Sequence, residues 1–245
     1  MALRIGFDLD GVLADMDAEL RKQAEALFGE VPTRPTSPSS DPEVAAGGTE
    51  PGDDVASGTG GAPSSRMLLS PRQQRRLWTH VQSIENFWET LAEIEPGIVE
   101  RLGALAVEKR WEVIFLTKRP HSAGATAQVQ TQRWLATRGF ALPSVFVVQG
   151  SRGRIAAALD LDVVVDDRPE NTLDIVMDSS ARAILIWRDD EKNLPAASRR
   201  LGIGVVRSVA ECLDVLAQSD SPAPEEGGLV ARVMKALGFR QPAGA

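Results

Sequence analysis

Charged and hydroxyl side chains follow three of the apolar runs in this sequence, at the points where buried strands would end. The first cluster is Asp8 with Asp10, the second is Thr117 with Lys118 and Arg119, and the third is Asp166 with Asp167 and Arg168. If the strands are parallel neighbours, their carboxyl ends share one edge of a sheet, and ligands of such sheets bind outside that edge. The three clusters would then meet in one site.

Three or four carboxylates brought together repel one another strongly, and a hard divalent cation with oxygen ligands is the usual remedy. Mg²⁺ fits best, because it prefers one or two carboxylates together with water and the phosphate oxygens of a substrate. We therefore expect a magnesium site among the aspartates. The competing interpretation of Asp8 and Asp10 is a pair of turn carboxylates, a common use of Asp-Gly. The aspartates and the threonine at the other strand ends weigh against it.

Apolar runs typical of strands covered on both faces alternate with helical patterns along most of the chain. The expected strands are 3–7, 111–116, 144–148, 161–165, 183–187 and 203–206, and the expected helices are 96–109, 123–138, 152–159 and 209–216. Such alternation predicts an α/β fold: a Rossmann-like, mainly parallel sheet with helices on both sides. These strands would supply the ends that carry the three clusters.

Residues 15–95 interrupt the alternation, and we expect them to form a small helical cap inserted after the first strand. Two helices are expected there, over 15–28 and 70–91, the second beginning with a Ser-Pro cap. Between them, residues 32–65 are rich in Pro, Gly and Ser, a composition that predicts a disordered loop. The expected division is an α/β core of 1–14 and 96–218, the cap, and a C-terminal linker with one amphipathic helix in 219–245.

The sequence at these strand ends resembles the haloacid dehalogenase superfamily of phosphatases. The similarity lies in FDLDGVL at 7–13, the strand that ends in Thr117, a basic residue that opens the helix at 152, and VVVDD at 163–167. More narrowly, FDLDGVLAD, NFWETLAEIEPGIVERL, LTKRP and VVVDDRPEN resemble the deoxyribonucleotidase branch, which removes phosphate from nucleoside monophosphates. The resemblance covers residues 3–30 and 70 to about 190.

The resemblance implies a role for each of several residues. Asp8 would attack phosphorus and form an aspartyl phosphate, and Asp10 would protonate the leaving oxygen and later deprotonate the attacking water. Mg²⁺ would be bound by Asp8, the backbone carbonyl of Asp10 and Asp166, with Asp167 as a further ligand or as a residue that orients one. The Thr117 hydroxyl would hold phosphate oxygens.

One position departs from the superfamily pattern, which has lysine at the start of its third motif. Arg152 stands there and would supply positive charge to the nucleophile and the phosphate, with a group bulkier than an ammonium. Lys118 and Arg119 are by default solvated loop charges, and the resemblance makes them candidate substrate contacts. Phe87 is the candidate for stacking on a substrate ring, because helical periodicity assigns Trp88 to the core.

The composition limits the classes of function. The net charge of −7 and the pI near 5.0 argue against general binding of nucleic acid polymers. No apolar run has the length of a membrane span, the start lacks the core of a signal peptide, and the single cysteine indicates neither a disulfide nor zinc. We expect a cytoplasmic protein whose partner is a small phosphorylated metabolite, in the first place a nucleotide. A sugar phosphatase and a non-catalytic binding or regulatory protein are the alternatives.

Overall fold

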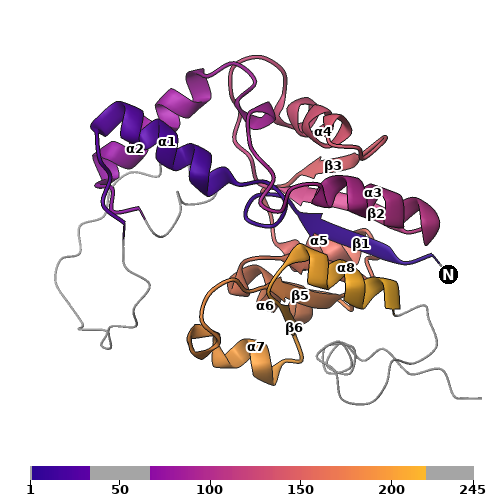
Figure 1. The fold of residues 1–245 in the computed structure, drawn as a ribbon. Helices are drawn as coiled ribbons and strands as arrows, with labels where there is room; N and C mark the ends of the chain where they lie inside the picture. Colours follow the sequence, from indigo (N-terminus) through magenta and orange to yellow (C-terminus); the bar gives the residue numbers. More distant parts are fainter. Residues whose placement is uncertain (1, 34–66, 219–245) are drawn as a thin grey trace, which may run out of the picture.

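The computed structural model describes residues 2–33 and 67–218 (Figure 1). The predicted disordered loop at 32–65, apart from its first two residues, and the predicted linker and helix in 219–245 lie outside the described residues. The described part forms one parallel sheet with helices on both faces and a pair of helices beyond one end of the strands. No helix in it has the length and apolar content needed to cross a membrane.

The sheet contains, within the described ranges, six parallel strands in the order β3-β2-β1-β4-β5-β6. The strands are β1 (Arg4–Asp8), β2 (Glu112–Thr117), β3 (Ser144–Val147), β4 (Val163–Asp166), β5 (Arg182–Ile186) and β6 (Gly204–Val206). The predicted α/β class with its parallel sheet is confirmed. Because β2, β1 and β4 are neighbours, the polar ends of these three strands share one edge of the sheet.

Two apolar layers lie against the sheet, one on each face. One layer is covered by α3 (Ile98–Glu108), α4 (Ala127–Thr137) and α8 (Val209–Gln218), the other by α5 (Arg152–Ala158) and α6 (Pro169–Asp178). Phe7 and Phe115 point into the first layer, whereas Leu116 and Val164 point into the second. Burial on both faces explains why these strands read as nearly continuous apolar runs.

Three helical segments of the described chain were not among the predicted ones. They are α6, the short α7 (Ala196–Arg200) and the 3-10 helix η2 (Glu191–Asn193). Helix α6 begins with Pro169 in its first turn and Glu170 beside it, a helix start signal that lies outside the apolar runs of the sequence. This missed helix has a consequence for the site, because its first turn follows directly on β4.

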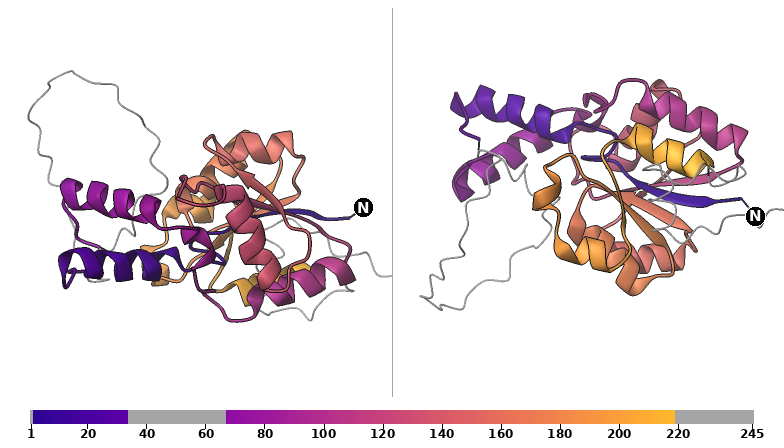
Figure 2. Two further views of the ribbon diagram at one scale, coloured as in Figure 1. Left: turned by 90° about the horizontal axis from the view of Figure 1, so that it is seen from above. Right: turned by 60° about the horizontal axis from the view of Figure 1, so that its bottom comes forward.

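Helices α1 (Met16–Phe28) and α2 (Pro71–Ser83) lie side by side and project from the carboxyl end of the sheet, as Figures 1 and 2 show from three directions. The Asp15 side chain caps α1 by accepting from the Ala18 backbone. The predicted start of α2 is confirmed, since Ser70 and Gln73 form a reciprocal capping box there. The inserted segment thus places a helical pair next to the strand ends.

The predicted helix over 70–91 is wrong in its second half. Helix α2 ends at Ser83, and Phe87–Glu89 form a separate 3-10 helix, η1. The helix stops where Ile84 takes an extended conformation, with ψ of 123°. Two residues on, Asn86 takes a left-handed conformation with φ of 52° and is held there by the loop at 123–125. Its backbone donates to the Ala123 carbonyl at 2.8 Å, and its side chain accepts from the Ala125 amide at 2.9 Å. The aromatic residues of η1 therefore do not continue the stripe of α2.

Candidate active site

Two buried carboxylates and a half-buried one meet where β1 and β4 end. Asp8 is the last residue of β1 and Asp166 the last of β4, and the pairing of Phe7 with Val165 brings the two aspartates to the same level. Asp8, Asp166 and Asp167 each offer a ligand oxygen, and these oxygens lie within 4.8 Å of one another. The predicted convergence of acidic side chains from separate strands is present in the structure.

The electrostatics of this trio suit a divalent cation. Burial, together with repulsion from Asp166 and Asp10, raises the pKa of Asp8 well above its usual value against the opposing charge of Arg152. Burial and the neighbouring Asp167 raise the pKa of Asp166 to about 6, and burial with repulsion from Asp8 raises the pKa of Asp167 to about 7. A bound cation would relieve these costs, and oxygen ligands of this kind fit Mg²⁺.

Asp167 approaches the loop after β1 at a position that only glycine can occupy. Gly11 has a φ of +89°, and a Cβ built on it would collide with the Asp167 carboxylate. Arg188, which follows β5, holds the same loop by donating to the carbonyls of Gly11 at 2.6 Å and Val12 at 3.2 Å. Asp167 Oδ1 is buried with no hydrogen-bond partner among the described residues, as expected of an oxygen reserved for a ligand.

Asp166 is oriented by the first turn of α6. The Asn171 side-chain amide donates to both carboxylate oxygens of Asp166, at 3.0 and 2.9 Å, and the Arg168 backbone donates to one of them at 2.9 Å. Sequence reasoning missed the roles of Gly11, Asn171 and Arg188. The signal for Asn171 was its position two residues after Pro169, in the first turn of a helix that starts directly after the aspartates.

Arg152 lies between the carboxylates. Its Nη2 donates to Asp8 Oδ1, its Nε lies 3.9 Å from Asp166 Oδ2, and its Nη1 is buried with no partner among the described residues. Gly153 makes this placement feasible, because a Cβ there would collide with the Asp174 carbonyl of α6 and push α5 away. The arginine thus reaches the place where positive charge was predicted, with one N–H group to spare.

Asp10 belongs to a different cluster. Thr117 Oγ1 donates to its Oδ2 at 3.1 Å, and Arg119 grips both of its oxygens through Nε and Nη2 at 2.7–3.1 Å. Arg119 is only 1% exposed, so the default interpretation of this residue as a solvated loop charge is wrong. Its guanidinium is committed to Asp10, whereas the neighbouring Lys118 is exposed at the cavity.

A cavity of about 410 Å³ opens over these groups. Asp8, Asp10, Lys118, Arg119, Arg152, Arg168, Glu170 and Asn171 are among the residues that line it, and Met16 and Trp78 of the helical pair and Trp88 of η1 complete its apolar side. Phe87 does not reach the cavity: it has no exposed surface and packs edge-on against Trp88 within the core. The half-buried Trp78 is the aromatic side chain that faces the cavity from α2.

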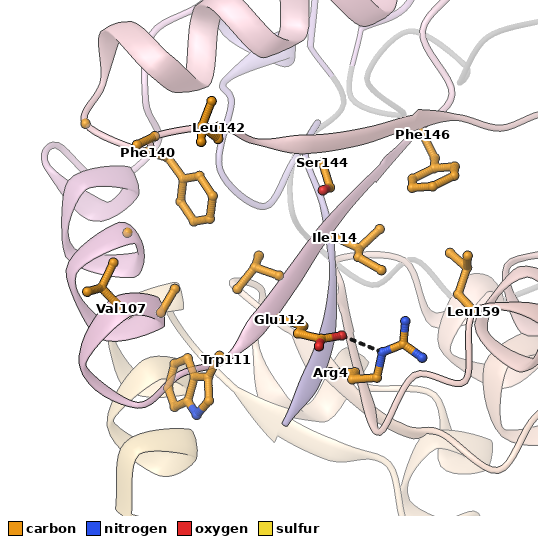
Figure 3. A pocket seen from close by; sticks show the side chains of 15 residues that line it. Arg4, Val107, Trp111, Glu112, Ile114, Phe140, Leu142, Ser144, Phe146 and Leu159 are labelled. Atoms are coloured by element: carbon orange, nitrogen blue, oxygen red, sulfur yellow. Dashed lines mark hydrogen bonds and ion pairs between the residues drawn. The ribbon is translucent and has the colours of Figure 1, made fainter. Parts of the chain in front are cut away.

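A second hollow, of about 560 Å³, lies at the opposite end of the sheet (Figure 3). It is bounded by the apolar side chains of Trp111, Phe140 and Phe146 and by an ion pair between Arg4 and Glu112 at 2.9 Å. This hollow contains neither a cluster of carboxylates nor a hydroxyl beside a base. The catalytic groups predicted from the sequence are all at the other end.

No family model matches the sequence, and no curated protein matches it. Among solved structures, the fold is similar to that of a haloacid dehalogenase-like family hydrolase from Streptococcus pneumoniae, at 11% identity and a TM-score of 0.48, over 88% of this chain and 98% of that one. It is also similar to a Thermotoga maritima protein assigned as a β-phosphoglucomutase, at 17% identity and a TM-score of 0.49, over 88% and 99%. At such low identities and TM-scores the similarity assigns no chemistry, and the function has to be derived from the site.

Proposed function

We propose that this chain is a magnesium-dependent phosphatase that hydrolyses phosphate monoesters through an aspartyl phosphate on Asp8. The observation that carries the proposal is the cluster of Asp8, Asp166 and Asp167 beside a cavity that Asp8 lines. The guanidinium of Arg152, which also lines the cavity, contacts Asp8 and approaches Asp166. Carboxylates held this close, with raised pKa values, need a cation. The resemblance of the surrounding motifs to the haloacid dehalogenase superfamily supports the same chemistry.

Asp8, Asp166 and Asp167 would hold the ion, and Asn171 would keep Asp166 turned toward it. When bound, Mg²⁺ would neutralise charge on the phosphoryl group and align it with the nucleophile. A ligand contribution from the backbone carbonyl of Asp10 stays a prediction. The side chain of Asp10 lies outside the trio and accepts hydrogen bonds from Arg119 and Thr117.

The reaction divides into two displacements at phosphorus. An Asp8 carboxylate oxygen bonds to phosphorus, the ester P–O bond breaks, and the leaving oxygen takes a proton from Asp10. Water then attacks phosphorus and gives a proton to Asp10, and the bond between phosphorus and the Asp8 oxygen breaks. Inorganic phosphate leaves and the Asp8 carboxylate is regenerated. The free Nη1 of Arg152 is the donor available to the phosphate oxygens, where it would stabilise developing charge. The Thr117 hydroxyl donates to Asp10 in the structure, so a contact from it to phosphate stays a prediction.

The proposed substrate is a small phosphorylated metabolite, with nucleoside monophosphates in the first place. Resemblance to the deoxyribonucleotidase branch favours a nucleotide, and Trp78 and Met16 offer an apolar wall on which a base could lie. In this proposal α1 and α2 act as the cap, because they supply that wall. Lys118, exposed beside the cavity, remains a candidate substrate contact. A cytoplasmic location of the protein remains a prediction.

The test begins with a generic aryl phosphate. The purified protein should release phosphate in the presence of Mg²⁺ and stop when EDTA is added. Asp8→Asn should abolish turnover, whereas Asp214→Asn, which changes a half-exposed aspartate on α8, should not. Undiminished phosphate release by the Asp8→Asn protein would remove the proposed nucleophile. A panel of nucleoside monophosphates and sugar phosphates then separates the two substrate classes, and Mg²⁺ binding without turnover on the whole panel would favour the binding protein.

A further inference from the structure

The pairing of Asp10 with Arg119 is a buried ion pair at the cavity that the proposed reaction does not explain. Arg119 donates to both carboxylate oxygens of Asp10, and its side chain is fully buried while that of Asp10 is 12% exposed. A bidentate pair between guanidinium and carboxylate fixes the plane of the carboxylate as well as its distance. Asp10 therefore has one orientation in the structure.

Arg119 is itself held from two further sides. Its Nη1 donates at 2.8 Å to Thr131 Oγ1 of α4, and its Cζ lies 5.0 Å from the centre of the Trp88 ring in η1. Trp88 is fixed in turn, since its indole N–H donates to the Pro120 carbonyl at 3.0 Å. The guanidinium thus uses its donors inside the protein, on Asp10 and Thr131, and presents its face to an aromatic ring.

We infer that Arg119 is a positioning residue for Asp10, and not a contact for substrate. It fixes the carboxylate that would deliver a proton to the leaving oxygen, at the position set by α4 and η1. The inference rests on the proposed phosphatase reaction and names a residue that its mechanism needs. It revises the expectation that Arg119 binds substrate, because a guanidinium already engaged on both sides has little left to offer a ligand.

The consequence of losing this orientation depends on the leaving group. An alkyl alcohol is a poor leaving group and needs the proton from Asp10 as the ester bond breaks, whereas a nitrophenolate leaves without it. A loosened Asp10 should therefore impair alkyl phosphates far more than nitrophenyl phosphate. A loss of general stability, or of substrate binding, would lower the rates of both substrates alike.

The chain offers a matched control. Arg138 also stacks on a tryptophan, with its Cζ 4.2 Å from the Trp134 ring, but it donates to backbone carbonyls such as that of Leu91 at 2.6 Å and does not line the cavity. Arg119→Lys and Arg138→Lys each remove a guanidinium that lies over a tryptophan ring, fully buried at Arg119 and half-buried at Arg138. Only the first removes the bidentate grip on Asp10.

The experiment measures kcat and KM of each variant for nitrophenyl phosphate and for the best alkyl phosphate of the panel. We expect Arg119→Lys to lower kcat for the alkyl phosphate about 10- to 100-fold, a part of the 10²–10⁴ that general acid catalysis supplies, with a change of about threefold or less for nitrophenyl phosphate. KM should stay near the wild-type value for both, and Arg138→Lys should leave the ratio of the two rates unchanged.

A second variant covers the case in which Arg119→Lys does not fold. Thr131→Val removes one anchor of Arg119 and should shift the ratio of rates in the same direction by a smaller factor, whereas Thr131→Ser should restore it. Equal losses on both substrates, or a rise in KM as the main effect, would overturn the inference. Failure of the wild type to hydrolyse either ester would instead count against the proposed function, so the two outcomes are distinguishable.

Discussion

The two aspartates of the first strand end lie two residues apart and have opposite surroundings. Asp8 lies with Asp166 and Asp167, and Arg152 is the guanidinium that pairs with Asp8 directly. Arg168 and Arg188 act on the trio more weakly, and the pKa values of all three carboxyl groups remain raised, so this side of the cavity is short of positive charge. Asp10 has one guanidinium to itself and a hydroxyl as well. One side of the cavity is thus short of positive charge, whereas the other is neutralised from within the protein.

This difference assigns different tasks to two chemically identical side chains. A region that lacks a counter-charge recruits one from solution, and here the oxygen ligands select a hard cation. A region with its own counter-charge is complete without a ligand and gains orientation instead. The comparison predicts that perturbations of the Asp8 side act through metal binding, and that perturbations of the Asp10 side leave metal binding intact.

The largest effect is expected from Gly11→Ala, which would disturb the carboxylate cluster of Asp8, Asp166 and Asp167. The new methyl group would collide with the Asp167 carboxylate, and the left-handed backbone adds strain of roughly 1–2 kcal/mol. We expect a loss of more than about 2 kcal/mol in stability and loss of measurable Mg²⁺ binding by calorimetry. Gly29→Ala is the control, because Gly29 also has positive φ but open space around a Cβ. If both variants bind Mg²⁺ equally, the collision is without consequence for the site.

A smaller effect is expected from Asn171→Ala, which leaves the carboxylates in place but frees Asp166 to turn. Groups that orient a metal ligand commonly contribute about 10- to 100-fold to affinity, and we expect a reduction of Mg²⁺ affinity in that range. Calorimetric titration measures it. Asn193→Ala, in η2, provides the comparison. An unchanged affinity would mean that the Arg168 backbone alone orients the ligand.

Arg152→Lys tests the positive charge that the protein itself supplies to the Asp8 cluster. The arginine reaches Asp8 and approaches Asp166 at the same time, and an ammonium could satisfy only one of them. We expect kcat/KM for an aryl phosphate to fall about tenfold, a change of about 1.4 kcal/mol. Arg154→Lys changes an exposed residue two positions further along α5 and should have no effect. A rise in rate with lysine would instead mark the arginine as a handicap.

The strand ends were predictable because they depend on local rules. The β4 run is apolar because helices cover both faces of the strand. The apolar run ends at Asp166 because the chain leaves the core after this residue. Parallel pairing then brings the ends of β1, β2 and β4 together whatever the details of the loops. The carboxylate trio follows from that alone.

The partners of the carboxylates were not predictable in the same way. Arg119 looks like a solvated loop charge in the sequence, and only the packing of α4 and η1 against its loop buries it beside Asp10. Phe87 was expected to face a ligand because the helix was expected to continue through it. Instead α2 ends before the extended Ile84, and the loop at 123–125 holds Asn86 in a left-handed conformation. Both errors come from contacts between segments far apart in the chain, which no local pattern encodes.

A change of pH tests the same comparison without any substitution, because it changes the protonation of the carboxyl groups of the Asp8 cluster. The pKa of Asp166 is raised to about 6 and that of Asp167 to about 7, so the metal-free folded state holds protons that the unfolded chain releases near pH 4. The contribution of these two groups to the free energy of unfolding should therefore be complete below about pH 4. It should decline as pH rises toward 7. We expect these two groups together to lower stability by about 3–4 kcal/mol between pH 5 and pH 7 in EDTA, measured by denaturant unfolding.

Mg²⁺ should reverse this decline, since it binds the deprotonated carboxylates and must displace their protons. Its affinity is accordingly expected to increase from pH 5 to pH 8, and saturating Mg²⁺ should flatten the dependence of stability on pH. Asp167→Asn removes one of the titrating groups and should weaken the decline in EDTA. A metal-free protein that grows more stable from pH 5 to pH 7 would contradict the unbalanced charge on the Asp8 side, and with it the physical reason for a metal there.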